Sequence, residues 1–204
     1  MDEAVDIANA RLPSLIEQFY PQFNALMKDV KILCLSDRNE SILMWSHYSD
    51  CHQGAVLEFS CVPEVDTPWG AAIPVKYAEM PLVYDEKFLI RVASGQASME
   101  NEAHQLIRKF VTAKAIEWAY EREWRVVLFR TDPNAATQDI KFDQRELAAI
   151  YLGCKMSDET KEKVVRTATQ LYPNTKIYFA RKMRSRFALE FHELPELLST
   201  NRAG

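Results

Sequence analysis

The stretch Trp118-Ala-Tyr-Glu-Arg-Glu-Trp-Arg-Val-Val-Leu-Phe129 decides the fold class of this chain. Its second half, residues 123–129, is rich in valine and alternates in polarity, which is typical of a β-strand with one buried face. Comparable apolar runs, each too short for an independent helix, occupy residues 30–36, 54–60, 148–152 and 175–180. We expect these segments and residues 123–129 to share one sheet.

Helical periodicity separates these strands. Residues 2–29, 98–120 and 157–171 carry apolar side chains at a spacing of about 3.6 residues. Ser41 and Ser157 are suited to cap helices, the first of them a short helix that ends near residue 50. Shorter extended segments are predicted at residues 73–78, 140–142 and 187–191. Because the strands come in groups, the predicted fold is α+β, with a largely antiparallel sheet and helices packed against it.

Length and composition favour one domain. The 204 residues are 48% hydrophobic and 26% charged, close to the average for soluble globular proteins. We expect a single domain over residues 1–204, with a helical N-terminal segment at residues 1–29 and an α+β core at residues 30–192.

Charge and targeting signals bear on location and partners. The net charge of −4 and the pI near 5.7 argue against coating of nucleic acid by bulk positive charge, although a local basic pocket is compatible with them. No apolar run reaches the roughly 18 residues of a membrane span, and the acidic N-terminus is unlike a secretory signal. We therefore expect a cytoplasmic protein without a membrane partner, and nucleic acid is not expected as a partner.

The shortage of glycine excludes several enzyme classes. The five glycines lie far apart, so neither a GxGxxG fingerprint nor a P-loop can be built from them. Kinases, classical dehydrogenases and P-loop NTPases are excluded. The four cysteines form no CxxC pair and are expected as reduced thiols.

The stretch Leu43-Met-Trp-Ser-His-Tyr-Ser-Asp-Cys-His-Gln-Gly54 is dense in side chains that can donate, accept or stack. On a continuous helix, His47 would share a face with Cys51, and Tyr48 with His52. Gly54 suits a helix stop with positive φ. Two interpretations stay open: a ligand pocket lined by Trp45, His47, Tyr48 and His52, or a helix that packs Tyr48 inward and caps loops. Adding Cys34 gives no common zinc-ligand spacing, so no metal site is predicted.

The acids before the strand form a second candidate. If the strand extends back to Glu121, the side chains of Glu121, Glu123 and Arg125 point the same way. One arginine for two carboxylates predicts one paired acid and one free, partly desolvated acid at a pocket mouth. The alternative is a solvated ladder of ion pairs at a strand edge.

The run Arg181-Lys-Met-Arg-Ser-Arg186 places four cations in six residues of an acidic protein. Such a cluster can bind phosphate groups, either free or in a nucleotide. The alternative is a solvated strand edge or loop.

These segments, in this order, resemble a bacterial family of domains of unknown function, the one numbered 2971. The resemblance covers about residues 30–180. It is carried by CLSDRNESILMWSHYSDCHQGAVLEF (34–59), VKY (75–77), WAYEREWRVVLF (118–129) and IYLG (150–153). Family members usually begin with an extended tyrosine-rich segment and an asparagine–aspartate–proline turn. This chain has neither, so we expect a short variant or one that lacks its first strands.

A Glu-x-Glu at a strand entrance is also similar to the acid pair of mono-ADP-ribosyltransferases, which hold NAD without a glycine-rich phosphate loop. The resemblance implies that Glu123 binds a ribose hydroxyl and stabilises the oxocarbenium ion, while Glu121 orients the acceptor. It places His47 and Tyr48 near the nicotinamide. Further candidates for NAD contacts are Trp45, His52, Arg125 and Ser36.

Two functional hypotheses follow, from different classes. The leading one is an NAD-using ADP-ribosyl transfer or NAD-cleaving domain in a bacterial toxin or phage-defence setting, with NAD as a co-substrate and no tightly bound cofactor. The alternative is a non-catalytic module that binds a small-molecule ligand, a nucleotide or a protein segment. Nuclease or hydrolase chemistry with His47 or His52 as the base has less support, because the acids show no metal-ligand clustering.

Overall fold

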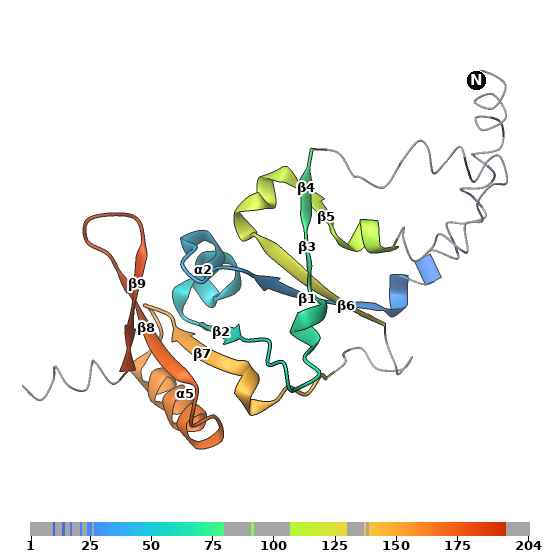
Figure 1. Cartoon of the computed structure of the whole chain (residues 1–204). Helices are drawn as coiled ribbons and strands as arrows, with labels where there is room; N and C mark the ends of the chain where they lie inside the picture. The colour runs from blue at the N-terminus through green and yellow to red at the C-terminus, as the bar shows by residue number, and fades with distance from the viewer. Residues whose placement is uncertain are drawn as a thin grey trace, which may run out of the picture. The chain divides into compact units, whose positions relative to one another are not determined.

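The computed structural model describes residues 27–79, 107–129 and 139–194, together with isolated positions 10, 14, 17, 21, 24, 25, 91 and 137. Helices and strands occur together in an α+β fold, as predicted (Figure 1). Every described position among residues 10–29 is helical, in agreement with the predicted N-terminal segment. No helix in the described ranges is long and apolar enough to cross a membrane.

The strands in the described ranges form three sheets. In the first, the order is β1 (Val30–Ser36), β6 (Glu123–Phe129), β3 (Ile73–Pro74). In the second, it is β2 (Ala55–Phe59), β7 (Leu147–Leu152), β8 (Lys176–Lys182), β9 (Leu189–Glu193). A third sheet pairs β4 (Lys76–Ala78) with β5 (Ala113–Ala115). The prediction of one shared sheet is therefore wrong, because an apolar run identifies a strand but does not specify its partner.

Strand direction follows the connections. The pairs β2–β7, β8–β9 and β3–β6 are antiparallel, while β7–β8 and β4–β5 are parallel. A parallel pair needs a long crossover, which α5 (Asp158–Leu171) supplies between β7 and β8. The Ser157 side chain accepts a hydrogen bond from the Thr160 amide and caps α5, as predicted.

The chain divides into two compact units, each built from two stretches of sequence. The first unit contains residues 1–35 and 72–139, and the second contains residues 36–71 and 140–204. A single domain over residues 1–204, with its core at residues 30–192, stays a prediction.

Strand β7 is the centre of the second unit. Its Ile150 and Leu152 belong to a buried cluster with Ala168 of α5. Its Ala149 and Tyr151 belong to another buried cluster, which contains Trp45. Since alternate residues of a strand point to opposite faces, β7 is covered on both sides.

Two predicted elements differ in the structure. Of the predicted helix at residues 98–120, the described part is α-helical only over residues 107–111, and β5 and the 3-10 helix η3 (Ile116–Glu121) follow. Residues 140–142 form no strand, and the Phe142 ring packs against Phe59 and Tyr172.

Candidate functional site

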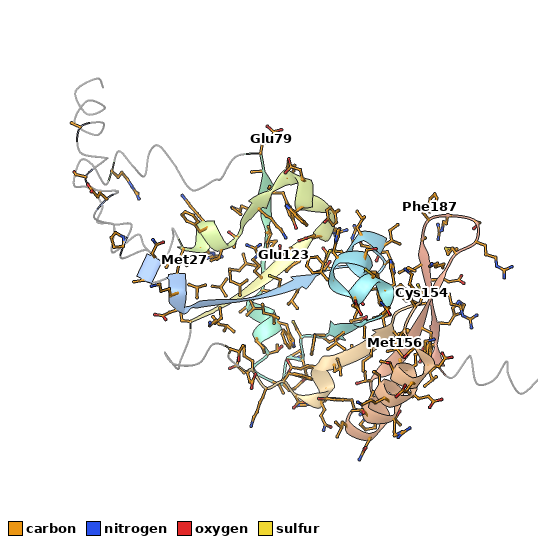
Figure 2. The ribbon with its side chains drawn as sticks, turned by 180° about the vertical axis from the view of Figure 1, so that it is seen from behind. Met27, Glu79, Glu123, Cys154, Met156 and Phe187 are labelled. Carbon is orange, nitrogen blue, oxygen red and sulfur yellow. The ribbon has the colours of Figure 1, made fainter. Side chains whose placement is uncertain are left out.

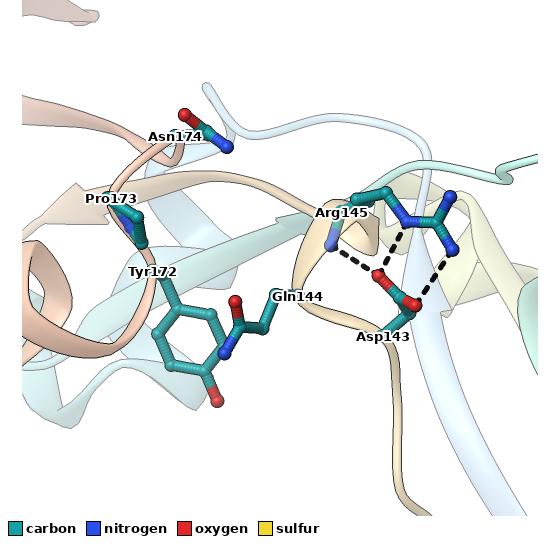
Figure 3. A pocket seen from close by; sticks show the side chains of 6 residues that line it. All are labelled: Asp143, Gln144, Arg145, Tyr172, Pro173 and Asn174. Atoms are coloured by element: carbon teal, nitrogen blue, oxygen red, sulfur yellow. Dashed lines mark hydrogen bonds and ion pairs between the residues drawn. The ribbon is translucent and has the colours of Figure 1, made fainter.

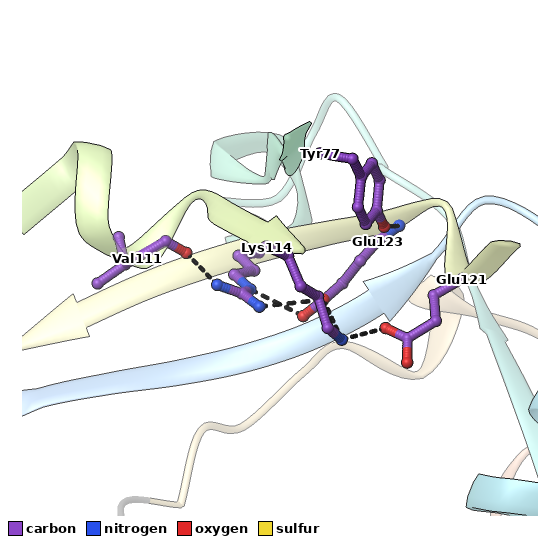
Figure 4. Close-up of polar contacts among 6 residues, drawn as sticks. Tyr77, Val111, Lys114, Glu121 and Glu123 are labelled. Atoms are coloured by element: carbon purple, nitrogen blue, oxygen red, sulfur yellow. Dashed lines mark hydrogen bonds and ion pairs between the residues drawn. The ribbon is translucent and has the colours of Figure 1, made fainter. Parts of the chain in front are cut away.

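Glu121 and Glu123 meet at the entrance of β6, but not by strand alternation (Figure 4). Glu121 ends η3, and Arg122, with φ 47°, turns the chain into the strand. Lys114 of β5 brings the two acids together. Its Nζ donates to Glu121 Oε2 and, at 3.0 Å, to Glu123 Oε2.

Glu123 also binds Arg125. The guanidinium donates from Nε to Glu123 Oε1 at 2.8 Å and from Nη2 to Oε2 at 3.0 Å, and Nη1 donates to the Val111 carbonyl. Glu121 and Glu123 are only 2% and 5% exposed. The prediction of one free acid is wrong, because Lys114 supplies the second cation. The alternative of a solvated ladder is also wrong, since the ion pairs are buried.

The ion pairs around Glu123 stabilise the charged forms of Glu123 and Lys114. Burial disfavours the ionised form of Glu123, but hydrogen bonds from Arg125, Cys34 and Lys114 outweigh it and lower the pKa of the carboxyl to about 2. The pKa of Lys114 is raised, because its hydrogen bonds to the two glutamates outweigh its burial. A carboxylate neutralised by two cations is poorly suited to act as a general acid or to stabilise a developing cation.

Three residues of the cluster were missed by sequence reasoning: Lys114, Tyr77 and Cys34. The Tyr77 hydroxyl accepts a hydrogen bond of 2.7 Å from the Glu123 amide, 46 residues away in the chain. Lys114 Nζ also lies 5.0 Å from the ring centroid of Trp118. Two of the family motifs contain these residues: VKY contains Tyr77, and the stretch at residues 34–59 begins with Cys34. Lys114 fell in a segment predicted as helix.

Cys34 is expected to alkylate more slowly than the other exposed cysteines. Burial of its sulfur, followed by the hydrogen bond to Glu123, raises the pKa of the thiol to about 11, although the residue as a whole is exposed. Because the thiolate is the reactive form, its fraction at pH 8 is on the order of a hundredfold below that of an ordinary thiol. Iodoacetamide labelling at pH 8, read by peptide mass spectrometry, measures this against exposed Cys51 and Cys61. Equal labelling rates would contradict it. All four cysteines are free thiols.

In the second unit, the segment predicted as one helix is interrupted. Helix α2 (Ile42–Tyr48) begins at Ser41, whose side chain accepts a hydrogen bond from the Met44 amide, as predicted. After it, Asp50, Cys51 and His52 have φ values of 44°, 51° and 72°. His47 and Cys51 therefore share no helical face, nor do Tyr48 and His52. Positive φ, expected at Gly54, occurs instead at residues 50–52, here called the left-handed turn.

Contacts from both sides hold this turn. Left-handed backbone costs roughly 1–2 kcal/mol for each residue with a Cβ atom. The turn is closed by hydrogen bonds from the Gln53 amide to the Asp50 carbonyl at 2.9 Å and from the Lys155 amide to the His52 carbonyl at 3.0 Å. The His52 ring stacks on Trp45 with 6.3 Å between centroids and 4° between planes. The turn therefore belongs to the packed structure of the unit.

The surroundings of His52 disfavour its charged form. The Ser46 hydroxyl donates to the Ile42 carbonyl at 2.9 Å, so at 3.0 Å it accepts from His52 Nε2. Burial, followed by the charges of Lys155 and Lys182, lowers the pKa of His52. Nδ1 is buried and has no hydrogen-bond partner within the described residues, so no carboxylate supports the ring from that side. In a catalytic pair the imidazole accepts the proton of the serine hydroxyl, and a third residue holds the other ring nitrogen. Here His52 donates to Ser46 and Nδ1 has no such partner, which argues against the hydrolase hypothesis for His52.

The other predicted site residues of this region differ widely in solvent exposure. Trp45 is 1% exposed, and its Nε1 donates to the Asn39 carbonyl at 2.6 Å, so it is a core residue. Tyr48 is 62% exposed, contrary to the interpretation that packs it inward, and the His47 ring lies at its edge. Ser36 is half-buried at the end of β1. Because Trp45–His52 and Glu121–Arg125 belong to different units, a common cleft stays a prediction.

A pocket of about 340 Å³ lies elsewhere in the second unit and contains none of the predicted site residues (Figure 3). Its lining residues are Asp143, Gln144, Arg145, Tyr172, Pro173 and Asn174. Arg145 donates from Nε and Nη2 to the Asp143 carboxylate, each at 2.9 Å, so the pocket carries no uncompensated charge. Residues 27–79, 107–129 and 139–194 contain no group of three or more His, Cys, Asp or Glu that could hold a metal ion. The absence of a metal site stays a prediction.

The predicted cation cluster forms the β8–β9 hairpin, here called the basic hairpin (residues 181–187). Arg181, Lys182, Arg184 and Arg186 are all exposed, and none forms an ion pair with another described residue. Phe187 is 101% exposed at the tip (Figure 2). The charges of Lys155 and Lys182 both lower the pKa of His52, so the positive potential of the hairpin reaches the left-handed turn.

The left-handed turn, Glu121 and Glu123 all lie in one segment of recognised sequence. Residues 44–126 match the model of a family described as "Protein of unknown function (DUF2971)". The resemblance predicted from the motifs is confirmed, over a shorter range than residues 30–180. No curated protein and no solved structure matches the chain. The likeness to mono-ADP-ribosyltransferases receives no support from these comparisons. The DUF2971 segment includes neither the basic hairpin nor Gly153.

Proposed function

We propose that this chain is a binding module for a phosphate-bearing anion and that the basic hairpin is its binding surface. The observation that carries the proposal is the set of exposed hairpin cations without acidic partners among the described residues. Guanidinium groups suit phosphate because their planar donors match its oxygens in pairs.

The charge of this region differs from that of the whole chain. Residues 175–189 contain no Asp or Glu, in a protein of net charge −4. Their cations are Lys176, Arg181, Lys182, Arg184 and Arg186. Glu190 lies opposite Arg181 in the strand register, but its Oε1 lies 3.2 Å from His192 Nε2 and it forms no ion pair with a described hairpin cation. The positive field at the hairpin is therefore left for an external anion.

The proposal develops the hypothesis of a non-catalytic binding module, but it places the binding surface on the basic hairpin instead of around Trp45. The pocket expected around Trp45 has no support, because Trp45 is buried. The NAD-cleavage hypothesis needs an acid free to act on the ribose, and both candidate acids are buried in ion pairs. Under the proposal, purified protein incubated with NAD releases no nicotinamide.

The double substitution Arg184→Gln and Arg186→Gln is expected to weaken binding of short-chain polyphosphate roughly tenfold at low salt, because each exposed charge pair contributes up to about 1 kcal/mol. Binding of the wild type should also weaken steeply with salt, since exposed charges are screened. Isothermal titration calorimetry of the full chain at several salt concentrations measures both effects.

The matched control removes two positive charges elsewhere in the same unit. Lys163 and Arg166 are exposed on α5, and changing both to Gln alters the net charge by the same amount. This control is expected to bind polyphosphate within about twofold of the wild type. Equal weakening by both double variants would show a response to net charge alone and would overturn the proposal.

A further inference from the structure

We infer that the phosphate-bearing ligand is single-stranded nucleic acid and that Phe187 stacks on one of its unpaired bases. The inference rests on the proposed function and narrows it. It combines two features of the same loop: cations for the backbone of the ligand, and a free aromatic face for its bases.

Backbone hydrogen bonds close the loop that carries Phe187. The Met183 amide donates to the Ala188 carbonyl at 3.0 Å, and the Ala188 amide donates to the Arg186 carbonyl at 2.9 Å. Arg186 Nε also contacts Met183 Sδ at 3.0 Å. The ring of Phe187, by contrast, is fully exposed at the tip (Figure 2). A large apolar ring in water gains free energy when another flat group covers it.

The neighbours of this ring indicate which flat group fits. Arg184 and Arg186 flank Phe187 in sequence and are exposed. A ligand that carries a phosphate at every unit and a planar base beside it can meet both kinds of side chain at once. Base faces are covered in a duplex and open in a single strand, so stacking on an exposed ring selects unpaired bases.

The same features favour nucleic acid over a lipid surface. Stable membrane attachment needs a substantial apolar insertion as well as basic residues, and one ring in a cationic loop supplies little apolar area. Three of the four cations are arginines, whose guanidinium planes can stack on bases as well as bind phosphate. The net charge of −4, which argues against nucleic acid from the sequence, is an average that the hairpin does not share.

The test compares four probes on the full chain: a labelled 12-nucleotide single strand, its duplex, short-chain polyphosphate and phosphatidylserine vesicles. We expect the single strand to bind more tightly than the duplex. Phe187→Ala should weaken single-strand binding about tenfold, because stacking on an aromatic ring contributes about fivefold to 150-fold per base. It should leave polyphosphate binding within about twofold. Phe187→Trp should keep the affinity and show quenching of indole fluorescence by the single strand.

The outcomes separate this inference from the proposed function. Unchanged single-strand binding by Phe187→Ala, with polyphosphate binding still dependent on Arg184 and Arg186, would overturn the stacking inference alone. If the wild type bound neither polyphosphate nor the single strand, both the proposed function and the stacking inference would be overturned. Vesicle binding that depends on Phe187, without single-strand binding, would assign the hairpin to a lipid surface and overturn the inference. Because Phe187 is fully exposed, its substitutions are not expected to alter folding.

Discussion

Replacing Glu123 by Gln is expected to lower the free energy of unfolding by about 3 kcal/mol. The substitution keeps the shape of the side chain and removes its charge, so the Arg125 guanidinium loses its carboxylate partner and keeps its hydrogen bond to the Val111 carbonyl. Breaking one member of a buried ion pair strands the charge of the other away from water. The cost is therefore much larger than that of a surface pair.

Urea denaturation followed by circular dichroism measures this effect. Glu117→Gln is a matched control, because Glu117 is exposed on η3 in the same unit and should cost less than about 0.5 kcal/mol. A loss below about 1 kcal/mol for Glu123→Gln would show that the ion pairs do not stabilise the fold.

The stabilising effect of Glu123 should disappear in acid. The pKa of its carboxyl is about 2 in the folded chain, below the ordinary value of 4.5. A lowered folded-state pKa adds stability above the unfolded value, and that stability is lost as the pH falls through the folded one. The gap in unfolding free energy between wild type and Glu123→Gln should therefore narrow between pH 4.5 and pH 2.

Local sequence patterns predicted the elements better than their partners. Residues 30–36 and 123–129 are strands with the expected bounds, and Ser41 and Ser157 cap their helices. These features depend on neighbours a few residues away, which a sequence displays directly. The division into three sheets depends on contacts between distant segments, for which alternation gives no information.

The candidate site shows the same limit. The Glu-x-Glu motif correctly placed two acids together. Their contacts with Lys114 and Tyr77 come from distant segments, and Glu121 ends the 3-10 helix η3 instead of lying on the strand. The left-handed turn was read as helix because three residues with side chains seldom adopt positive φ in succession. Tertiary contacts, rather than local preference, hold it in that form.

Replacing Gly153 by Ala should test how firmly those contacts fix the turn. An added Cβ atom would lie 2.1 Å from the His52 carbonyl oxygen and 2.8 Å from the Gly54 carbonyl oxygen. Both are backbone atoms held in hydrogen bonds, to the Lys155 and Gly153 amides at 3.0 and 2.9 Å, so neither can move without breaking a contact. We expect a loss of about 3 kcal/mol or more in unfolding free energy, at the upper end of overpacking costs.

Gly70→Ala is the matched control for Gly153→Ala, since both positions lie in the second unit. At Gly70 the nearest atom to an added Cβ is Thr67 Cγ2 at 3.8 Å, an ordinary van der Waals contact. This control should be neutral or stabilising by up to about 1 kcal/mol, because alanine restricts the unfolded chain. Urea denaturation of the two variants gives the comparison. If Gly153→Ala were as stable as Gly70→Ala, the His52 carbonyl would have to move freely, and the left-handed turn could not be rigidly held by its contact with the end of β7.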